Sequence, residues 1–284
     1  MAADPSTSPG TRAVLDDIDA RPGSTASLLR TLIGVYLRPL GGWISTADLV
    51  ALAGDLGIPP AQARTGVTRL KQKGLLLAER TEAIGYRLAP DAVGMLERGD
   101  RRIFEMREMT DADDWCLVSF SIPESERRTR HQLRRRLQWI GAGIVSPALW
   151  ICPGHLQDEV LEILDDLDAR RWATLFRASA PVPPGSLVEA AAQWWDLAAL
   201  RTEHLAFQES LTGLPTEPFA AYVRLIDSWR VLPYTDPGLP PSMLPADWPG
   251  RRSFDEFARL SAALAEPAWE HVRALTRREA PSSP

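Results

Sequence analysis

The chain is poor in cysteine, in lysine and in long apolar runs. It holds only two cysteines, Cys116 and Cys152, among 284 residues, which excludes a disulfide scaffold and suits a reducing compartment. No apolar stretch reaches the length that spans a bilayer, and segment 1–23 lacks the basic region and apolar stretch of a secretory signal. These absences predict a cytoplasmic protein that makes no contact with a membrane.

Recognisable catalytic and cofactor motifs are also missing. The sequence has no glycine-rich phosphate loop and no nucleophile motif. Its four histidines do not have the spacing of a metal site; they are His131, His155, His204 and His271. We therefore expect no catalytic residue, no metal and no cofactor.

Positive charge is concentrated in one short segment of an acidic protein. The net charge is −5, yet residues 60–87 carry six basic and two acidic side chains, a local net charge of +4. Lys71 and Lys73, the only lysines, both lie in this segment. Such a distribution is typical of a protein that offers one face to a polyanion.

The pattern of residues 24–90 predicts a winged helix-turn-helix. The expected elements are helices over 27–38, 47–55 and 60–73 and strands over 43–45, 75–79 and 86–88. Thr46 is the expected cap of the second helix, and Gly74 is the expected end of the third. Helix, strand, helix, turn, helix and hairpin, in this order, is the winged-helix plan.

The helix over 60–73 has the two faces that a DNA-reading helix needs. Its small apolar face can dock on the other helices, while long polar residues on the other side can reach bases and phosphates. Arg64 and Gln72 can read guanine and adenine edges, and Arg80 and Arg87 beside the wing would meet phosphate or the minor groove. The predicted DNA-binding residues are Arg64, Thr65, Thr68, Arg69, Lys71, Gln72, Arg80 and Arg87. The alternative is a polar face that is merely solvated.

The rest of the chain predicts a linker helix and two further domains, so that the fold class is α+β. The second domain has strands over 115–121, 142–145, 148–152 and 172–177 and helices over 126–140 and 155–169, the βαββαβ order of a ferredoxin-like fold. Helices over 187–211, 219–231 and 252–277 follow, with a proline-rich loop over 232–250. The expected organisation is a disordered arm 1–23, a winged helix-turn-helix 24–90, a linker helix 91–112, a ferredoxin-like domain 113–180, a helical C-terminal domain 181–276 and a tail 277–284.

Four motifs together are similar to one known family. They are GGWIST at 41–46, GIP at 57–59 with RTGVTRL at 64–70, LRRRLQWIG at 133–141 with SPALW at 146–150, and DPGLPPSMLPADWPG at 236–250. With them the chain resembles, over nearly its whole length, the PaaX family of phenylacetate-degradation repressors. The resemblance implies a homodimeric repressor of aromatic catabolism genes. It also implies that an aryl-acetyl-CoA effector, such as phenylacetyl-CoA or a related acyl-CoA, releases the repressor from double-stranded operator DNA.

Two features are candidates for the effector site, each with a structural alternative. The helix over 126–140 carries six arginines that could grip coenzyme A phosphates or flanking DNA; we favour pairing with the acidic helix over 155–169. Tryptophans 172, 194 and 195 could line an aromatic pocket, although such residues more often belong to a core. The candidate effector-binding residues are Arg134, Arg135 and Trp195.

Two other functions stay open as alternatives. The middle domain looks like that of CRISPR-associated metal-dependent nucleases, in which an Asp at the end of the first strand binds metal. Here Ser121 stands in that place, and a serine hydroxyl replaces a carboxylate poorly at a divalent cation. Asp113 and Asp114 precede the strand, at its wrong end. The other alternative is a winged-helix protein-interaction module without a role on DNA.

Overall fold

The computed structural model describes residues 21–105 and 107–276 and has an α+β fold. The chain divides into two compact units. Unit 1 contains the residues up to Phe104, Phe207–Val231 and the residues from Ser253 onward; unit 2 contains Glu105–Ala206 and Leu232–Arg252. Residues 1–20 of the predicted disordered arm, and the predicted tail 277–284, lie outside the described residues. None of the described helices combines the length and the apolar character that crossing a membrane requires.

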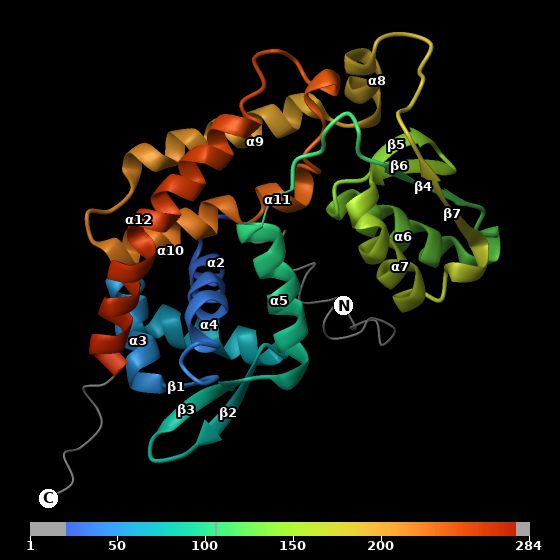
Figure 1. The fold of residues 1–284 in the computed structure, drawn as a ribbon. Helices are drawn as coiled ribbons and strands as arrows, with labels where there is room; N and C mark the ends of the chain where they lie inside the picture. Colours follow the sequence, from blue (N-terminus) through green and yellow to red (C-terminus); the bar gives the residue numbers. More distant parts are fainter. Residues whose placement is uncertain (1–20, 106, 277–284) are drawn as a thin grey trace, which may run out of the picture. The chain divides into compact units, whose positions relative to one another are not determined.

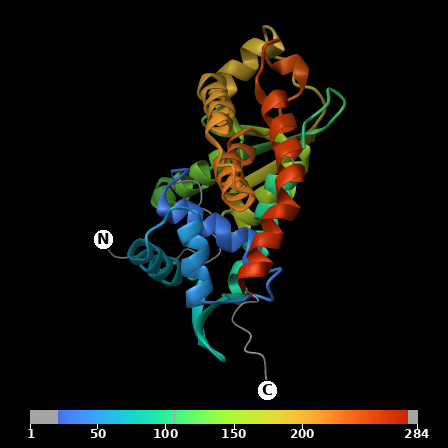
Figure 2. The same ribbon diagram turned by 90° about the vertical axis from the view of Figure 1, so that its left-hand side faces the viewer.

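Unit 1 joins a small antiparallel sheet to helices from both ends of the sequence (Figure 1). Its elements are α2 (Thr25–Leu32), the π-helical segment η1 (Ile33–Leu37), β1 (Trp43–Ser45), α3 (Thr46–Asp55), α4 (Pro60–Gln72), β2 (Leu76–Arg80), β3 (Ile84–Leu88), α5 (Pro90–Phe104), α10 (Pro218–Trp229) and most of α12 (Gly250–Thr276). The strand order is β1-β3-β2, and the β2–β3 hairpin extends away from the helices of this unit (Figure 1). Helix α12 runs without interruption for 27 residues (Figure 2).

The first two helices of unit 1 differ from the prediction in their ends. Thr46 is not the cap of α3; the backbone N–H of Asp48 donates to Ser45 Oγ at 2.9 Å, and Thr46 is the first helical residue. Ser45 takes this role because it ends β1 with an extended backbone, the conformation of an N-cap residue. The helix expected over 27–38 begins at Thr25 and changes to π-helix from Ile33 onward.

Unit 2 is built on a four-stranded antiparallel sheet with the order β5-β6-β4-β7. Its elements are β4 (Trp115–Phe120), α6 (Arg127–Trp139), β5 (Gly143–Ser146), β6 (Leu149–Pro153), α7 (Gln157–Asp166), β7 (Ala173–Ala178), α8 (Leu187–Trp194), the first part of α9 (Leu197–Ser210) and α11 (Leu232–Thr235). Short 3-10 turns of this unit occupy Glu124–Glu126, Gly154–Leu156, Arg170–Trp172 and Pro241–Met243, and a further one, Leu211–Gly213, follows α9 in unit 1. Leu133 and Leu137 of α6 and Val160 of α7 form a core with one face of the sheet.

The two cysteines lie opposite each other on β4 and β6, inside this core. Cys116 and Cys152 are register partners, both are fully buried, and both are free thiols. A hydrogen bond with Cys152 lowers the pKa of the Cys116 thiol. The expectation that both are core residues is confirmed by this burial.

The prediction of a single helix over 187–211 is wrong, because the helix is interrupted at Trp195. Trp195 has an extended backbone, and its indole Nε1 donates to the carbonyl of Gly141 at 2.8 Å. Its ring also lies so close to Gly143 that a Cβ there would overlap it. After the break, Asp196 accepts a hydrogen bond from the N–H of Ala199, which starts α9. Tertiary packing thus overrides the helical periodicity.

Much of the proline-rich loop is buried within unit 2, including residues 236–240, whereas Pro241, Ser242, Ala246 and Asp247 are exposed. Asp236, which is 6% exposed, accepts a hydrogen bond from the N–H of Gly238 at 2.8 Å. His204 Nε2 lies 2.7 Å from the other oxygen of Asp236, and the imidazole is fully buried. The motif at 236–250 therefore contributes to packing within this unit.

Candidate nucleic-acid interface

Helix α4 has well-defined ends because of the residues at its two termini. Pro60 occupies the first helical position, where the missing N–H costs nothing. Gly74 has a φ of +76°, and the N–H of Leu75 donates to the carbonyl of Leu70 at 3.0 Å. These contacts form a glycine-based C-terminal cap, so the predicted end of the helix is confirmed.

The two faces of α4 are separated as the sequence predicted. Its buried residues are Ala63, Gly66, Val67 and Leu70. The residues predicted to contact DNA from this helix are all exposed: Arg64, Thr65, Thr68, Arg69, Lys71 and Gln72. Gly66 lets α4 approach α2 closely, because a Cβ there would overlap Leu29 Cδ1. The apolar face thus docks on α2 and leaves the polar face in solvent.

The cationic side chains on this face have no acidic partner in the part of the chain that the structure describes. Within residues 21–105 and 107–276, no ion pair involves Arg64, Arg69 or Lys71. The two threonines differ from them, because Thr65 Oγ1 and Thr68 Oγ1 each donate at 3.0 Å to a carbonyl one turn earlier. The charges of α4 are therefore available to a ligand, whereas the threonine protons are already engaged.

The β2–β3 hairpin beside α4 adds two basic and two apolar side chains. Arg80 and Arg87 are exposed, and Arg87 Nε forms an ion pair of 2.8 Å with Glu79 on the neighbouring strand. Leu77 and Ile84 are 49% and 66% exposed, although both are large and apolar. Neither residue stands out in the sequence as part of a binding surface. They are exposed because the hairpin extends away from the helices, and the sequence does not show where the hairpin extends.

A pocket of about 460 Å³ adjoins Arg64. Its lining comes from the first turns of α3, from α4 and from the tip of the hairpin: Ser45, Thr46, Ala47, Val50, Arg64, Ala83 and Ile84. The pocket joins three elements in one concave surface. From the sequence, Ser45 was expected only as part of a strand and Thr46 only as a helix cap, and no signal placed them beside Arg64. We call α4, this pocket and the β2–β3 hairpin together the α4 surface.

The three candidate effector residues do not come together. Arg134 donates to the carbonyl of Pro147 at 2.8 Å, and the guanidinium of Arg135 lies 4.3 Å from the ring centroid of Trp139. Both belong to α6, which covers one face of the sheet. Trp195 is 6% exposed and belongs to a separate apolar cluster with Trp115 and Ile151.

The arginines of α6 are largely held by their own unit. Arg130 forms an ion pair of 2.7 Å with Glu124, and Arg136 forms one of 3.4 Å with Asp166 of α7. Burial lowers the pKa of Arg136 from its ordinary value. Arg127 and Arg128, at the start of the helix, are exposed.

Unit 2 offers little for metal chemistry among the residues that can be described. Ser121 is exposed just after β4, and its N–H donates to the carbonyl of Trp172. Asp113 accepts hydrogen bonds from the backbone and hydroxyl of Thr110, which lower its carboxyl pKa. Across the described ranges, no group of three or more His, Cys, Asp or Glu side chains could hold a metal ion.

Comparison with known proteins gives matches along most of the chain. Three family models match: PaaX-like protein over residues 24–92, PaaX protein central Cas2-like domain over 108–188, and PaaX-like protein C-terminal domain over 186–274. Transcriptional repressor PaaX from Escherichia coli (strain K12) is 25% identical over 249 residues, covering 82% of this chain and 78% of that protein. Uncharacterized protein Rv0674 from Mycobacterium tuberculosis matches in structure, with a TM-score of 0.58 and 22% identity. That match covers 85% of this chain and 97% of the other.

Proposed function

Because this chain belongs to the PaaX family, we propose that it is a DNA-binding transcriptional repressor that reads duplex DNA with the α4 surface. The observation that carries this proposal is the exposed cationic face of α4, which has no acidic partner among the described residues, in a protein of net charge −5. The Escherichia coli relative, a transcriptional repressor, supports the same function. A polyanion with regularly spaced phosphates is the ligand that such a face suits best.

The order of elements supports the fold that this function needs. We propose that α2, β1, α3, α4 and the β2–β3 hairpin form a winged helix-turn-helix, with α4 as recognition helix and the hairpin as wing. We propose a ferredoxin-like domain for the βαββαβ segment from β4 to β7, in keeping with its strand order β5-β6-β4-β7.

The side chains of the α4 surface have distinct proposed roles. Arg64 and Gln72 are placed on the exposed side, where a guanidinium or an amide can reach base edges in the major groove. Arg69 and Lys71 would neutralise phosphates, which fixes the position of the helix without reading sequence. Arg80 and Arg87 would contact the backbone or the minor groove from the wing.

We propose further that the repressor is a homodimer and that an aryl-acyl-CoA such as phenylacetyl-CoA relieves repression of aromatic-acid catabolism genes. A single recognition helix reads too few base pairs for genomic specificity, which supports the dimer. The family resemblance supports the effector class. Arg134 and Arg135 are the proposed phosphate contacts, since arginine forks fit phosphate oxygens.

Titration of the full chain with duplex DNA from upstream of its own gene and of the neighbouring genes tests this function. We expect one fragment to bind more tightly than an unrelated duplex of equal length, and we expect affinity to fall as salt rises. Addition of phenylacetyl-CoA should then release the bound fragment. Specific binding that acyl-CoA does not relieve would remove the effector from the proposal, and binding indifferent to salt would instead support a protein-interaction module.

A further inference from the structure

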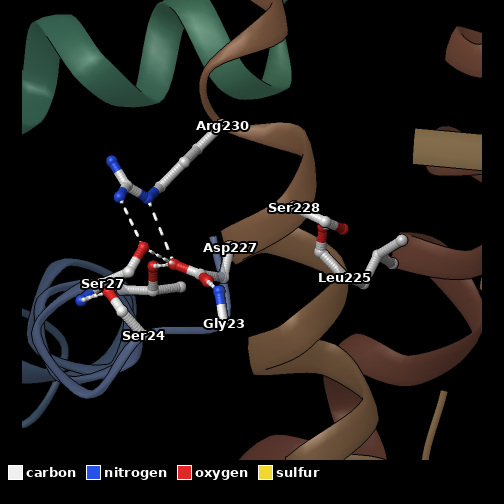
Figure 3. A network of polar contacts seen from close by, with 8 residues as sticks. Gly23, Ser24, Ser27, Leu225, Asp227, Ser228 and Arg230 are labelled. Carbon is white, nitrogen blue, oxygen red and sulfur yellow. Dashed lines mark hydrogen bonds and ion pairs between the residues drawn. The ribbon is translucent and has the colours of Figure 1, made fainter. Parts of the chain in front are cut away.

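A buried polar cluster joins α2, the first helix of unit 1, to α10, which comes much later in the sequence (Figure 3). Its centre is Asp227 of α10, which is only 1% exposed. One carboxylate oxygen accepts hydrogen bonds from Ser27 Oγ at 2.5 Å and Thr31 Oγ1 at 2.8 Å. The other oxygen accepts one from the N–H of Gly23 at 2.6 Å. Asp227 thus holds two successive turns of α2 and the residue before its cap.

Arg230, the C-cap residue of α10, completes the cluster. Its Nε donates to Asp227 at 3.3 Å, and its terminal nitrogen Nη2 donates to Ser27 Oγ at 2.8 Å. The side chain is 6% exposed, so both charges of this pair are largely removed from water. Removing two charges from water is costly, and well-packed apolar residues often give equal or better stability. We therefore expect the cluster to contribute less to stability than to geometry, because its directional hydrogen bonds fix how α2 lies against α10.

The opposite side of α2 carries the recognition helix. Thr25 Oγ1 donates to Gln62 Oε1 of α4 at 3.3 Å. Leu29, fully buried, lies so close to Gly66 that a Cβ there would overlap its side chain. Ser27 and Thr31 are one turn apart and face α10, while Thr25 and Leu29 face α4. Helix α2 therefore connects Asp227 to α4 through direct contacts on its two sides.

The preceding helix α3 is fixed to the same C-terminal helices. Arg224 of α10 donates at 3.0 Å to the carbonyl of Leu56, just after α3. His271 of α12 lies 2.8 Å from Asp55, the last residue of α3. Helices α10 and α12 therefore contact the segments that position α4. These segments are α2 and the end of α3.

We infer that Asp227 is a positioning residue for DNA recognition: through Ser27 and Thr31 it fixes α2, and α2 fixes the recognition helix α4. Residues of α10 then contribute to DNA recognition although none of them lies on the α4 surface. This inference rests on the proposed DNA-binding function. It names a route by which a change in the C-terminal segment reaches α4.

The test is an apolar replacement of the cluster in the full chain, Ser27→Ala, Thr31→Val, Asp227→Leu and Arg230→Met together. We expect a melting temperature equal to or above that of the wild type, because no buried charge is left unpaired. We expect affinity for the specific duplex to fall about tenfold or more at a temperature where both proteins are folded, because a small misplacement of contacting groups costs binding energy. Ser228→Ala is the matched control: its hydroxyl lies on the same helix but donates only to the carbonyl of Leu225.

A second pair of variants decides the question if the fourfold replacement does not fold. Thr31→Ser keeps the hydroxyl that bonds Asp227, whereas Thr31→Val keeps the shape and loses it. We expect Thr31→Val to weaken specific DNA binding severalfold and Thr31→Ser to restore wild-type affinity. Folded variants without the cluster that bind the specific duplex like the wild type would overturn this inference and leave the repressor function intact. A wild-type protein that binds no duplex would overturn the proposed function itself.

Discussion

Helices α4 and α6 are both rich in basic residues, but the fold uses these residues differently. In α6, the denser of the two, Arg130 and Arg136 have acidic partners and Arg134 bonds a backbone carbonyl. In α4, Arg64 and Lys71 project from the helix with no acidic partner in the ranges that the structure describes. The density of charge in a sequence therefore does not identify a binding surface. The positions of the acidic groups in the fold decide which cations stay available.

The largest expected effect follows from removing the cations of α4. The double variant Arg64→Ala and Lys71→Ala should lose about 2–4 kcal/mol of DNA-binding free energy, roughly 30-fold to 1,000-fold in affinity, because a base contact and a phosphate contact are lost together. Fluorescence anisotropy with the specific duplex measures this loss. Arg127→Ala with Arg128→Ala is the matched control, since it removes two exposed charges from α6. Equal losses in the two double variants would break the comparison.

A smaller effect, on stability rather than on binding, is expected from α6. Arg136 is 6% exposed, and Arg136→Ala would leave a gap beside α7 and remove one ion-pair partner of Asp166. We expect the free energy of unfolding to fall by about 1–3 kcal/mol. Denaturant titration followed by circular dichroism measures the change. Arg64→Ala, an exposed position, should change it by no more than about 0.5 kcal/mol; a larger change there would mean that α4 also depends on its arginines to fold.

The salt dependence of DNA binding gives a finer version of the same contrast. Lys71→Ala should reduce the slope of log affinity against log salt by about 1, because one phosphate contact and its released counterion are lost. Arg134→Ala should leave the slope of operator binding unchanged, since its guanidinium bonds the carbonyl of Pro147. Titrations at several salt concentrations measure both slopes. A reduced slope for Arg134→Ala would place α6 on the DNA.

The sequence predicted α4 well because its information is local. Pro60, Gly74 and the spacing of Ala63, Val67 and Leu70 lie within one short segment, and they set both the ends and the buried face. The break at Trp195 could not be predicted in this way, because the indole is held by Gly141, 54 residues away. Only Asp196, a favourable N-cap residue, gave a local signal that a new helix begins there.

The environment of α4 was beyond sequence reasoning for the same reason. Ser27 and Asp227 are 200 positions apart, and nothing in either segment indicates the other. The exposure of Arg64 could be predicted from its place on the helix, but the pocket beside it could not. That pocket requires the first turn of α3 and the tip of the hairpin to meet. Sequence periodicity thus predicts which side of a helix is polar, and tertiary contacts decide what that side adjoins.

The smallest expected effect concerns the threonines of α4. Their hydroxyl protons are already hydrogen-bonded within the helix, whereas Arg64 and Lys71 of the same helix are available to a ligand. Thr68 Oγ1 donates its only proton to the carbonyl of Arg64, and DNA phosphate oxygens can only accept. A phosphate contact would therefore exchange one hydrogen bond for another, so Thr68→Val should cost only about 0.5–1 kcal/mol, roughly twofold to fivefold in affinity. Anisotropy titrations measure this, with Thr129→Val in α6 as the matched control. A loss beyond tenfold would show that the hydroxyl leaves the helix carbonyl in the complex, so that a group engaged in the free protein still contributes to recognition.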